Sequence, residues 1–252
     1  MFFHKLLAFT KKILLSAGFL LAFSSDGIAK GLPSEYYQIT DVNESKKYFF
    51  EYLYKLIEKE NKNILRERKF VKIFLTSNIL AINFDSKEFK RLLKIKKRYK
   101  IKNLYNLKAY MKKIDIVPPS MALAQAAVES GWGRSRFIKE ANNIFGHWTY
   151  NPNIGMLPED REIGATHFIR IFKSLHTSIS AYMLNLNRNF AYKAFQDSRY
   201  EQRLENKQPD GLFLSQTMLN YSGIAEEYLK ILKDIILSNN LDIYDKRFYQ
   251  QN

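Results

Sequence analysis

Residues 118–133, PPSMALAQAAVESGWG, constrain the fold more than any other part of the chain. The two prolines stop the element before them and suit the first turn of a new helix. The alanines that follow favour helix and carry little bulk, so other elements can pack closely around them. We therefore predict a central buried helix that ends at Glu129, where Gly131 or Gly133 supplies the positive φ of the terminating turn.

Other segments also show helical periodicity. Residues 43–71 place apolar side chains at helical spacing between charged ones, which predicts a long helix capped by Asn43 or Ser45. Residues 30–42 before it are expected to form a loose leader. Further helices are predicted over residues 87–102, 135–141, 177–187, 192–206, 210–220 and 223–237.

One region breaks the helical pattern. The turn signal NPNIG is followed by residues 166–174, in which apolar and polar side chains alternate as in a strand. A small β-hairpin is therefore expected between Trp148 and Lys173. The predicted fold class is mainly α (α+β): a helical domain with one small β-hairpin insert and an N-terminal helical extension.

Residues 1–29 have the order of regions found in a secretory signal: lysines, a short apolar run and small residues ending at Ala29. The apolar run, residues 13–23, is short for a membrane span, which needs about 20 residues. We expect cleavage after Ala29, which places the protein in the periplasm or cell envelope. Retention of the segment as a membrane anchor is the alternative.

The chain is strongly basic, with a net charge of +15, and contains no cysteine. Disulfides and thiolate chemistry are thereby excluded. Outside the cytoplasm a basic protein meets cell wall or membrane surface rather than nucleic acid. Residues 87–102 contain nine Lys or Arg, and this helix face either is simply solvated or contacts an anionic polymer.

Glu129 is the candidate catalytic residue. A carboxyl group at the C-terminal end of a helix faces the negative end of the dipole, and the apolar neighbour Trp132 adds desolvation. Both effects raise its pKa toward the range where a carboxylic acid can protonate a leaving oxygen. Glycoside cleavage fits these requirements. The alternative is that Glu129 only caps or salt-bridges a helix end.

Other catalytic chemistries lack their motifs. His147, His167 and His176 have no helical metal-ligand spacing, so we predict neither a metal nor a cofactor. The chain also has no G-x-S-x-G nucleophile elbow and no glycine-rich phosphate loop.

The stretches VPPSMALAQAAVESGWGRSRF, NNIFGHW and SISAYMLNLNRNFAY resemble the Bax-type endo-β-N-acetylglucosaminidases of glycoside hydrolase family 73. The resemblance implies a lysozyme-like fold and cleavage of the β-1,4 bond between N-acetylglucosamine and N-acetylmuramic acid in peptidoglycan. It also implies that Glu129 is the catalytic acid and that Tyr221 lines the cleft. We expect residues 30–110 to form the extension, 111–240 the glucosaminidase domain and 241–252 a tail.

The second catalytic group is open. Glu162 is the first choice among the acidic residues Glu159, Asp160 and Glu162, because related enzymes carry a mobile acidic residue at this hairpin edge. An inverting route needs such a base about 6.5–9.5 Å from the acid, whereas assistance by the sugar's acetamido group needs none.

Several residues are candidate substrate contacts. Trp148 and Tyr150 are expected to stack on sugar, whereas Asn143 can bond either buried backbone or an acetamido group. The remaining candidates are Trp132 and Phe145, as core residues that also line the cleft, and Tyr182.

The predicted protein is a monomeric peptidoglycan hydrolase whose partners are glycan strands. A muramidase, a lytic transglycosylase and a non-catalytic wall-binding module are the alternatives. All of them are compatible with the fold, because a fold does not determine a function.

Overall fold

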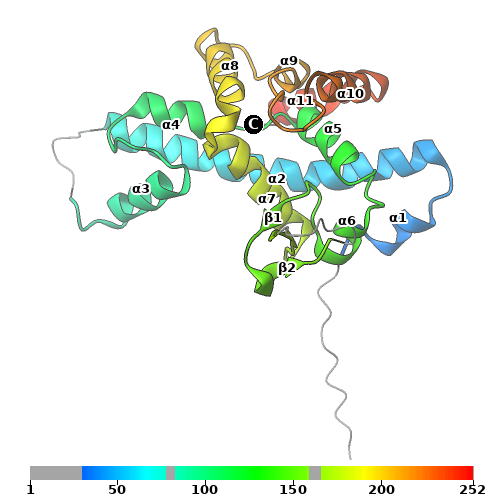
Figure 1. The fold of residues 1–252 in the computed structure, drawn as a ribbon. Helices are drawn as coiled ribbons and strands as arrows, with labels where there is room; N and C mark the ends of the chain where they lie inside the picture. Colours follow the sequence, from blue (N-terminus) through cyan, green and yellow to red (C-terminus); the bar gives the residue numbers. More distant parts are fainter. Residues whose placement is uncertain (1–29, 78–82, 159–165, 252) are drawn as a thin grey trace, which may run out of the picture.

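The computed structural model describes residues 30–77, 83–158 and 166–251, which form a helical body with one small sheet (Figure 1). The prediction of a mainly α fold with a small β insert is confirmed. The helices are α1 (Ser34–Gln38), α2 (Val42–Thr76), α3 (Lys87–Arg98), α4 (Leu107–Lys113), α5 (Pro119–Glu129), α6 (Arg136–Ala141), α7 (Leu175–Arg188), α8 (Lys193–Leu204), α9 (Gly211–Ser215), α10 (Ala225–Ser238) and α11 (Asp242–Gln250), with short 3-10 turns η2 (Pro152–Ile154) and η3 (Phe190–Tyr192).

Helix α5 is the centre of the body, as its alanines predict. Every residue from Pro119 to Ala127 is buried, and the helix contacts α2, α9, α10 and α11. Pro119 occupies the first turn, where its missing N–H costs nothing. Small side chains let four helices approach it, so α5 becomes the element against which the others are positioned.

Helix α2 runs along the whole body, with α1 at one end and α3 and α4 at the other (Figure 1). Its 35 residues span about 52 Å at 1.5 Å per residue. The prediction that Asn43 or Ser45 caps this helix is wrong. Asp41 caps the helix instead, because its side chain accepts a hydrogen bond from the Glu44 amide.

The N-terminal segment before α2 is ordered and packed, not a loose leader. It contains α1, and Leu32 and Tyr36 are 3% and 1% exposed. The Tyr36 hydroxyl donates to the carbonyl of Trp132, in the turn that follows α5. The segment is too short to show periodicity, yet its two apolar side chains complete the core beside that turn.

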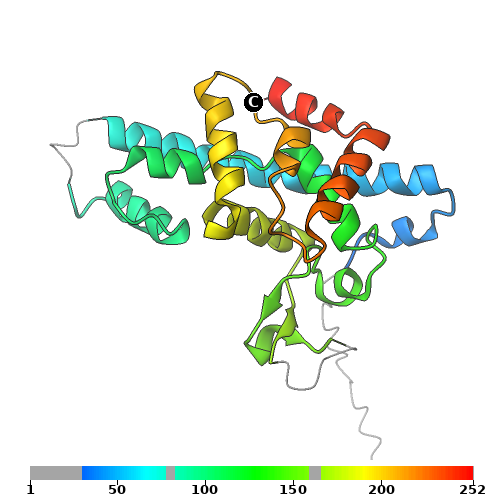
Figure 2. The same ribbon diagram turned by 45° about the horizontal axis from the view of Figure 1, so that its top comes forward.

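The sheet has three antiparallel strands, β1 (Trp148–Thr149), β2 (Gly155–Met156) and β3 (Phe168–Arg170), in the order β1-β3-β2. It projects from one side of the helical body, away from α8 and α11 (Figure 2). The expected β element between Trp148 and Lys173 is therefore present, with one strand more than a hairpin. Ile169 pairs with Trp148 on one side and with Met156 on the other.

A buried ion cluster holds the segment that leads into α5. Asp115 is 0% exposed, and Arg203 reaches both of its carboxylate oxygens at 3.1 Å. Burial opposes ionisation of Asp115, but the neighbouring guanidinium groups, Arg68 among them at 3.5 Å, outweigh it and hold its pKa below the usual value. Arg199, itself buried, donates to the carbonyls of Asp115 and Ile116.

Residues 241–252, expected to form a tail, include the packed helix α11. Asp245 of this helix accepts hydrogen bonds from the Ser120 amide and hydroxyl, at 2.8 and 2.6 Å, and from the Gly211 amide. Burial raises the pKa of Asp245 to about 7, against the opposing effect of these bonds. A single carboxyl group thus caps the first turns of α5 and α9. A Cβ at Gly211 would lie 1.9 Å from the Ser120 hydroxyl oxygen, so only glycine fits there.

Within residues 30–77, 83–158 and 166–251, no helix is both long enough and apolar enough to cross a membrane.

Candidate active site

Glu129 is the last residue of α5, and its side chain is half-buried. Ser130 closes the helix end: its hydroxyl donates to the Ala126 carbonyl at 2.6 Å and accepts from the Gly133 amide at 2.8 Å. These bonds satisfy backbone groups that the end of a helix leaves open. The carboxyl group of Glu129 therefore has no capping role in this turn and is available for other partners.

A directed chain of hydrogen bonds leads to Glu129. The Tyr182 hydroxyl donates to Gln125 Oε1 at 2.5 Å, and Gln125 Nε2 donates to the Tyr228 hydroxyl at 3.0 Å. Tyr228 then donates its proton to Glu129 Oε1 at 2.8 Å. Because the Tyr228 hydroxyl already accepts a hydrogen bond from Gln125, its single proton is donated to Oε1 of Glu129. Oε2 of Glu129 receives no hydrogen bond from the described residues.

The surroundings raise the pKa of Glu129. Burial is the main cause, and the hydrogen bond from Tyr228 partly opposes it by favouring the ionised form. With Oε1 accepting from Tyr228, the acidic proton belongs on Oε2, the oxygen that is free to meet a leaving group. The arrangement is that of a general acid.

Four tyrosines surround this carboxyl group, and we call them the tyrosine cluster: Tyr182, Tyr192, Tyr221 and Tyr228. Tyr221 and Tyr228 stack with parallel rings 5.6 Å apart. Burial raises the pKa of all four, and the charge of Glu129 adds to the effect. They are neutral at physiological pH. Tyr182, Tyr192 and Tyr228 are buried, whereas Tyr221 is partly exposed, so Tyr221 has the ring that can stabilise positive charge developing on a sugar.

The tyrosine cluster is continuous with the loop that leads into the sheet. Phe145 stacks on Tyr182 with ring centroids 3.8 Å apart, and both side chains are buried. Asn143 lies just before it and is 1% exposed. Its amide nitrogen donates to the carbonyls of His147 and Arg170, at 2.8 and 2.9 Å, and its oxygen accepts from the His147 amide. Two roles are predicted for Asn143, and the structure shows the first of them, hydrogen bonding to buried backbone groups.

Trp148 and Tyr150 stand on the sheet side and are open to solvent. They are 61% and 74% exposed, and Trp148 stacks on the His167 ring at 4.0 Å. Trp148 lies on β1 and Tyr150 just after it, and large exposed aromatic side chains are suited to contact with sugar rings.

Trp132, in the turn that follows α5, packs against helix α2. Its indole packs against Phe49 and Phe50 of α2, with ring centroids 6.0 and 5.5 Å away. Glu162, with Glu159 and Asp160, lies outside the described residues, in the segment that joins β2 to β3.

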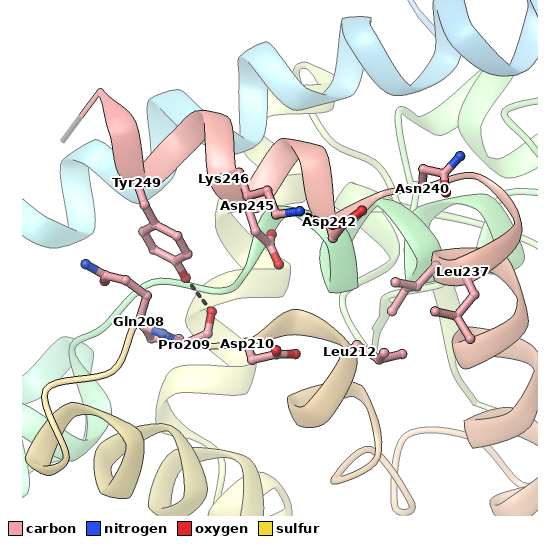
Figure 3. Close-up of a pocket in the computed structure, with 11 residues that line it drawn as sticks. Gln208, Pro209, Asp210, Leu212, Leu237, Asn240, Asp242, Asp245, Lys246 and Tyr249 are labelled. Atoms are coloured by element: carbon pink, nitrogen blue, oxygen red, sulfur yellow. Dashed lines mark hydrogen bonds and ion pairs between the residues drawn. The ribbon is translucent and has the colours of Figure 1, made fainter.

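One pocket lies elsewhere on the molecule, away from Glu129 (Figure 3). It has a volume of about 530 Å³ and is lined by residues of α9, α10 and α11 and of the loop before α9, among them Asp245 and Tyr249. Asp245 contacts Ser120 at the first turn of α5, and Glu129 lies nine positions further along the helix, which is about 13.5 Å. This pocket therefore belongs to the opposite end of α5.

No group of three His, Asp or Glu side chains within the described ranges could hold a metal ion. Burial lowers the pKa of His147 to about 4, so this imidazole is neutral at physiological pH.

Gln125, Tyr192 and Tyr228 are not among the site residues predicted from the sequence. Gln125 carries a usable signal, since it precedes Glu129 by four residues and therefore lies on the same face of α5. Tyr192 and Tyr228 carry none. They come from η3 and α10, and only the packing of these elements brings them to Glu129.

A family model described as mannosyl-glycoprotein endo-beta-N-acetylglucosaminidase matches residues 104–241, more than half of the chain. The chain belongs to the glucosaminidase family. The chain is also 30% identical, over 188 residues, to protein bax of Escherichia coli strain K12. The match covers 73% of the chain and 65% of that protein, so it spans less than two thirds of the relative. No solved structure matches the chain significantly. The resemblance to Bax-type glucosaminidases is confirmed, and with it membership of a family of glycoside hydrolases.

Proposed function

We propose that the protein is a secreted peptidoglycan hydrolase that cleaves the β-1,4 bond between N-acetylglucosamine and N-acetylmuramic acid, with Glu129 as general acid. The observation that carries the proposal is the Tyr228–Glu129 hydrogen bond at 2.8 Å. It occupies one oxygen of a carboxyl group whose pKa is raised by burial and leaves the other for the leaving group. Family membership and the basic charge support the choice of an acetamido-sugar polymer with anionic groups.

In the proposed reaction, protonated Glu129 transfers its proton from Oε2 to the glycosidic oxygen as the bond to the anomeric carbon breaks. The ring of Tyr221, which is partly exposed, then faces the positive charge that develops on the sugar. Water completes the hydrolysis in one of two ways. A carboxylate of residues 159–162 activates it on the opposite face, or the substrate's acetamido oxygen first attacks the anomeric carbon and water opens the resulting ring.

The deciding experiment is mass spectrometry of the fragments released from purified sacculi. Reducing N-acetylglucosamine ends are expected. Reducing N-acetylmuramic acid would instead identify a muramidase, anhydro-muramic acid a lytic transglycosylase, and an absence of fragments together with retained wall binding a non-catalytic module.

Glu129→Gln should abolish hydrolysis, because the amide keeps the shape of the side chain but has no proton to transfer. Loss of a general acid typically costs about 10²–10⁴ in rate. The measurement is turnover on sacculi alongside circular dichroism. Glu140→Gln, a substitution at an exposed residue of α6, is the matched control. Substantial turnover by folded Glu129→Gln protein would contradict the assignment.

Secretion is part of the proposal and rests on residues 1–29. N-terminal sequencing of the protein recovered from the cell envelope should begin near Lys30. A chain that still begins at Met1 in the membrane fraction would show that the segment serves as an anchor.

A further inference from the structure

An open pocket of about 270 Å³ lies next to the turn that follows Glu129. One wall is this turn, with Gly131 and Trp132, and the other comes from α1 and the first turns of α2, with Tyr36 and Lys46. The second wall precedes residue 104, where the match to the glucosaminidase family begins. The pocket therefore exists only because the N-terminal extension packs against the family domain.

The turn is held in an unusual conformation. Gly131, Trp132 and Gly133 all have positive φ, of 53°, 55° and 75°. A tryptophan in this region is strained, and such strain persists only where the surroundings impose it. The extension imposes it here: Tyr36 donates to the Trp132 carbonyl, and a Cβ at Gly133 would lie 2.4 Å from Leu32 Cδ1.

The pocket carries two cations that lack an acidic partner. Lys46 Nζ lies 4.8 Å from the Trp132 ring centroid, and the Arg134 guanidinium lies 5.2 Å from that of Tyr36. Neither forms an ion pair with any carboxylate of the described residues. Asp41 is nearby but does not line the pocket, and its carboxylate caps α2.

These features favour an anionic ligand. The pocket adjoins the N-terminal end of α2, where the helix dipole is positive. Guanidinium and ammonium groups give short, charge-assisted hydrogen bonds to carboxylates, and the aromatic walls keep both cations in place. A neutral sugar would not neutralise the charges of Lys46 and Arg134.

We propose that this pocket binds a carboxylate of the peptide stems on the glycan, so that the enzyme selects peptide-bearing strands over stripped ones. The inference rests on the proposed function. Gly131 and Trp132 follow Glu129 by two and three residues, so their Cα atoms lie within about 11 Å of that of Glu129. A stem of three or four residues extends about as far, at 3.3–3.6 Å per residue. A strand cleaved at Glu129 can therefore place a stem in the pocket.

The first test compares hydrolysis of intact glycan strands with that of strands treated with an amidase, which removes the stems and leaves the lactyl carboxylate. Lys46→Gln/Arg134→Gln should lose about tenfold in kcat/KM on intact strands, mainly through KM, because charge-assisted hydrogen bonds are lost. On stripped strands it should match the wild type. Lys47→Gln/Lys108→Gln removes the same charge from exposed positions outside the pocket and should change neither. Equal losses on both kinds of strand, or no loss, would overturn the proposal.

The second test needs no catalysis. The tripeptide L-alanyl-γ-D-glutamyl-diaminopimelate should bind the wild-type protein in a calorimetric titration, and Lys46→Gln/Arg134→Gln should weaken this binding about tenfold. The same tripeptide with its carboxylates converted to amides should not bind. Binding that is unchanged by the double substitution would overturn the proposal. If the wild type cleaves neither kind of strand, the proposed function fails on its own, and this titration still decides what the pocket binds.

Discussion

At the scale of single residues, Glu129 owes its chemistry to its partners more than to its place in the chain. The helix dipole and burial both disfavour its charge, and Tyr228 partly restores it. Because Tyr228 accepts from Gln125, its own proton can only point toward Glu129. The tuning of the acid therefore depends on a three-residue relay from α7 through α5 to α10.

Tyr228→Phe should move the alkaline limb of kcat/KM to higher pH. The hydrogen bond from Tyr228 lowers the pKa of Glu129, so its removal raises that pKa further and keeps the acid protonated at higher pH. The measurement is kcat/KM against pH for both proteins. Tyr200→Phe, on α8, is the control and should leave the limb in place. A limb that stays or moves to lower pH would show that Glu129 is not the group titrating there.

Glu162→Gln tests the second catalytic group. If Glu162 activates water, turnover should fall by about 10²–10⁴, while Glu159→Gln and Asp160→Asn change it little. Rates within a few-fold for all three would instead favour assistance by the acetamido group. Tyr221→Phe and the anomeric configuration of the first product then test that route, since inversion requires a base and retention excludes it.

At the scale of elements, helix α3 combines a high density of charged residues with a single narrow packing face. Phe89, Leu92 and Ile95 are buried, and the remaining positions are mostly exposed Lys and Arg. The buried stripe explains why the helix docks on α2. Arg98 pairs with Glu67 of α2, and the lysines at the remaining positions are open to an anionic polymer or to water alone.

Binding to isolated cell wall should weaken as salt is added, because exposed charges are screened beyond about 10 Å at 0.1 M salt. Replacing Lys90, Lys94 and Lys97 with glutamine should reduce both the binding and its salt dependence in a pelleting assay with Glu129→Gln protein. Lys55, Lys59 and Lys230, exposed on other elements, provide a charge-matched control set. Equal pelleting at low and high salt would show that the α3 face is only solvated.

At the scale of the whole molecule, the extension and the family domain share one core. One cluster of buried apolar side chains includes residues of both parts, from Leu32 to Phe248. Helix α2 precedes the matched family region, yet it packs directly on α5 and α7. We therefore expect the two parts to unfold together.

Leu53→Ala should lower the free energy of unfolding of the entire protein by about 2–5 kcal/mol, because it leaves a cavity in this core. Leu53 is 0% exposed, whereas Ile73 on the same helix is 53% exposed, so Ile73→Ala should have little effect. The measurement is urea unfolding followed by far-UV circular dichroism and by tryptophan fluorescence, since Trp132 and Trp148 both lie within the family region. Two separate transitions would contradict a shared core.

The sequence by itself determined the features that depend on near neighbours. Alanine content and two prolines predicted α5, the position of Glu129 at its end indicated an acid, and alternation placed the sheet. Motif resemblance indicated the family, since the motif residues lie close together in the chain. These signals come from residues that are close together in the chain, so they can be detected in a single sequence.

Only the tertiary structure decided the contacts between distant residues. Tyr228 is 99 residues from Glu129, Arg203 is 88 from Asp115, and Asp245 is 125 from Ser120. Periodicity reports which face of a helix is apolar, but not which helix will cover that face. The acid's hydrogen-bond donor, the capping of α5 by α11 and the basic pocket all arise from that choice, because each needs side chains from elements brought together by packing.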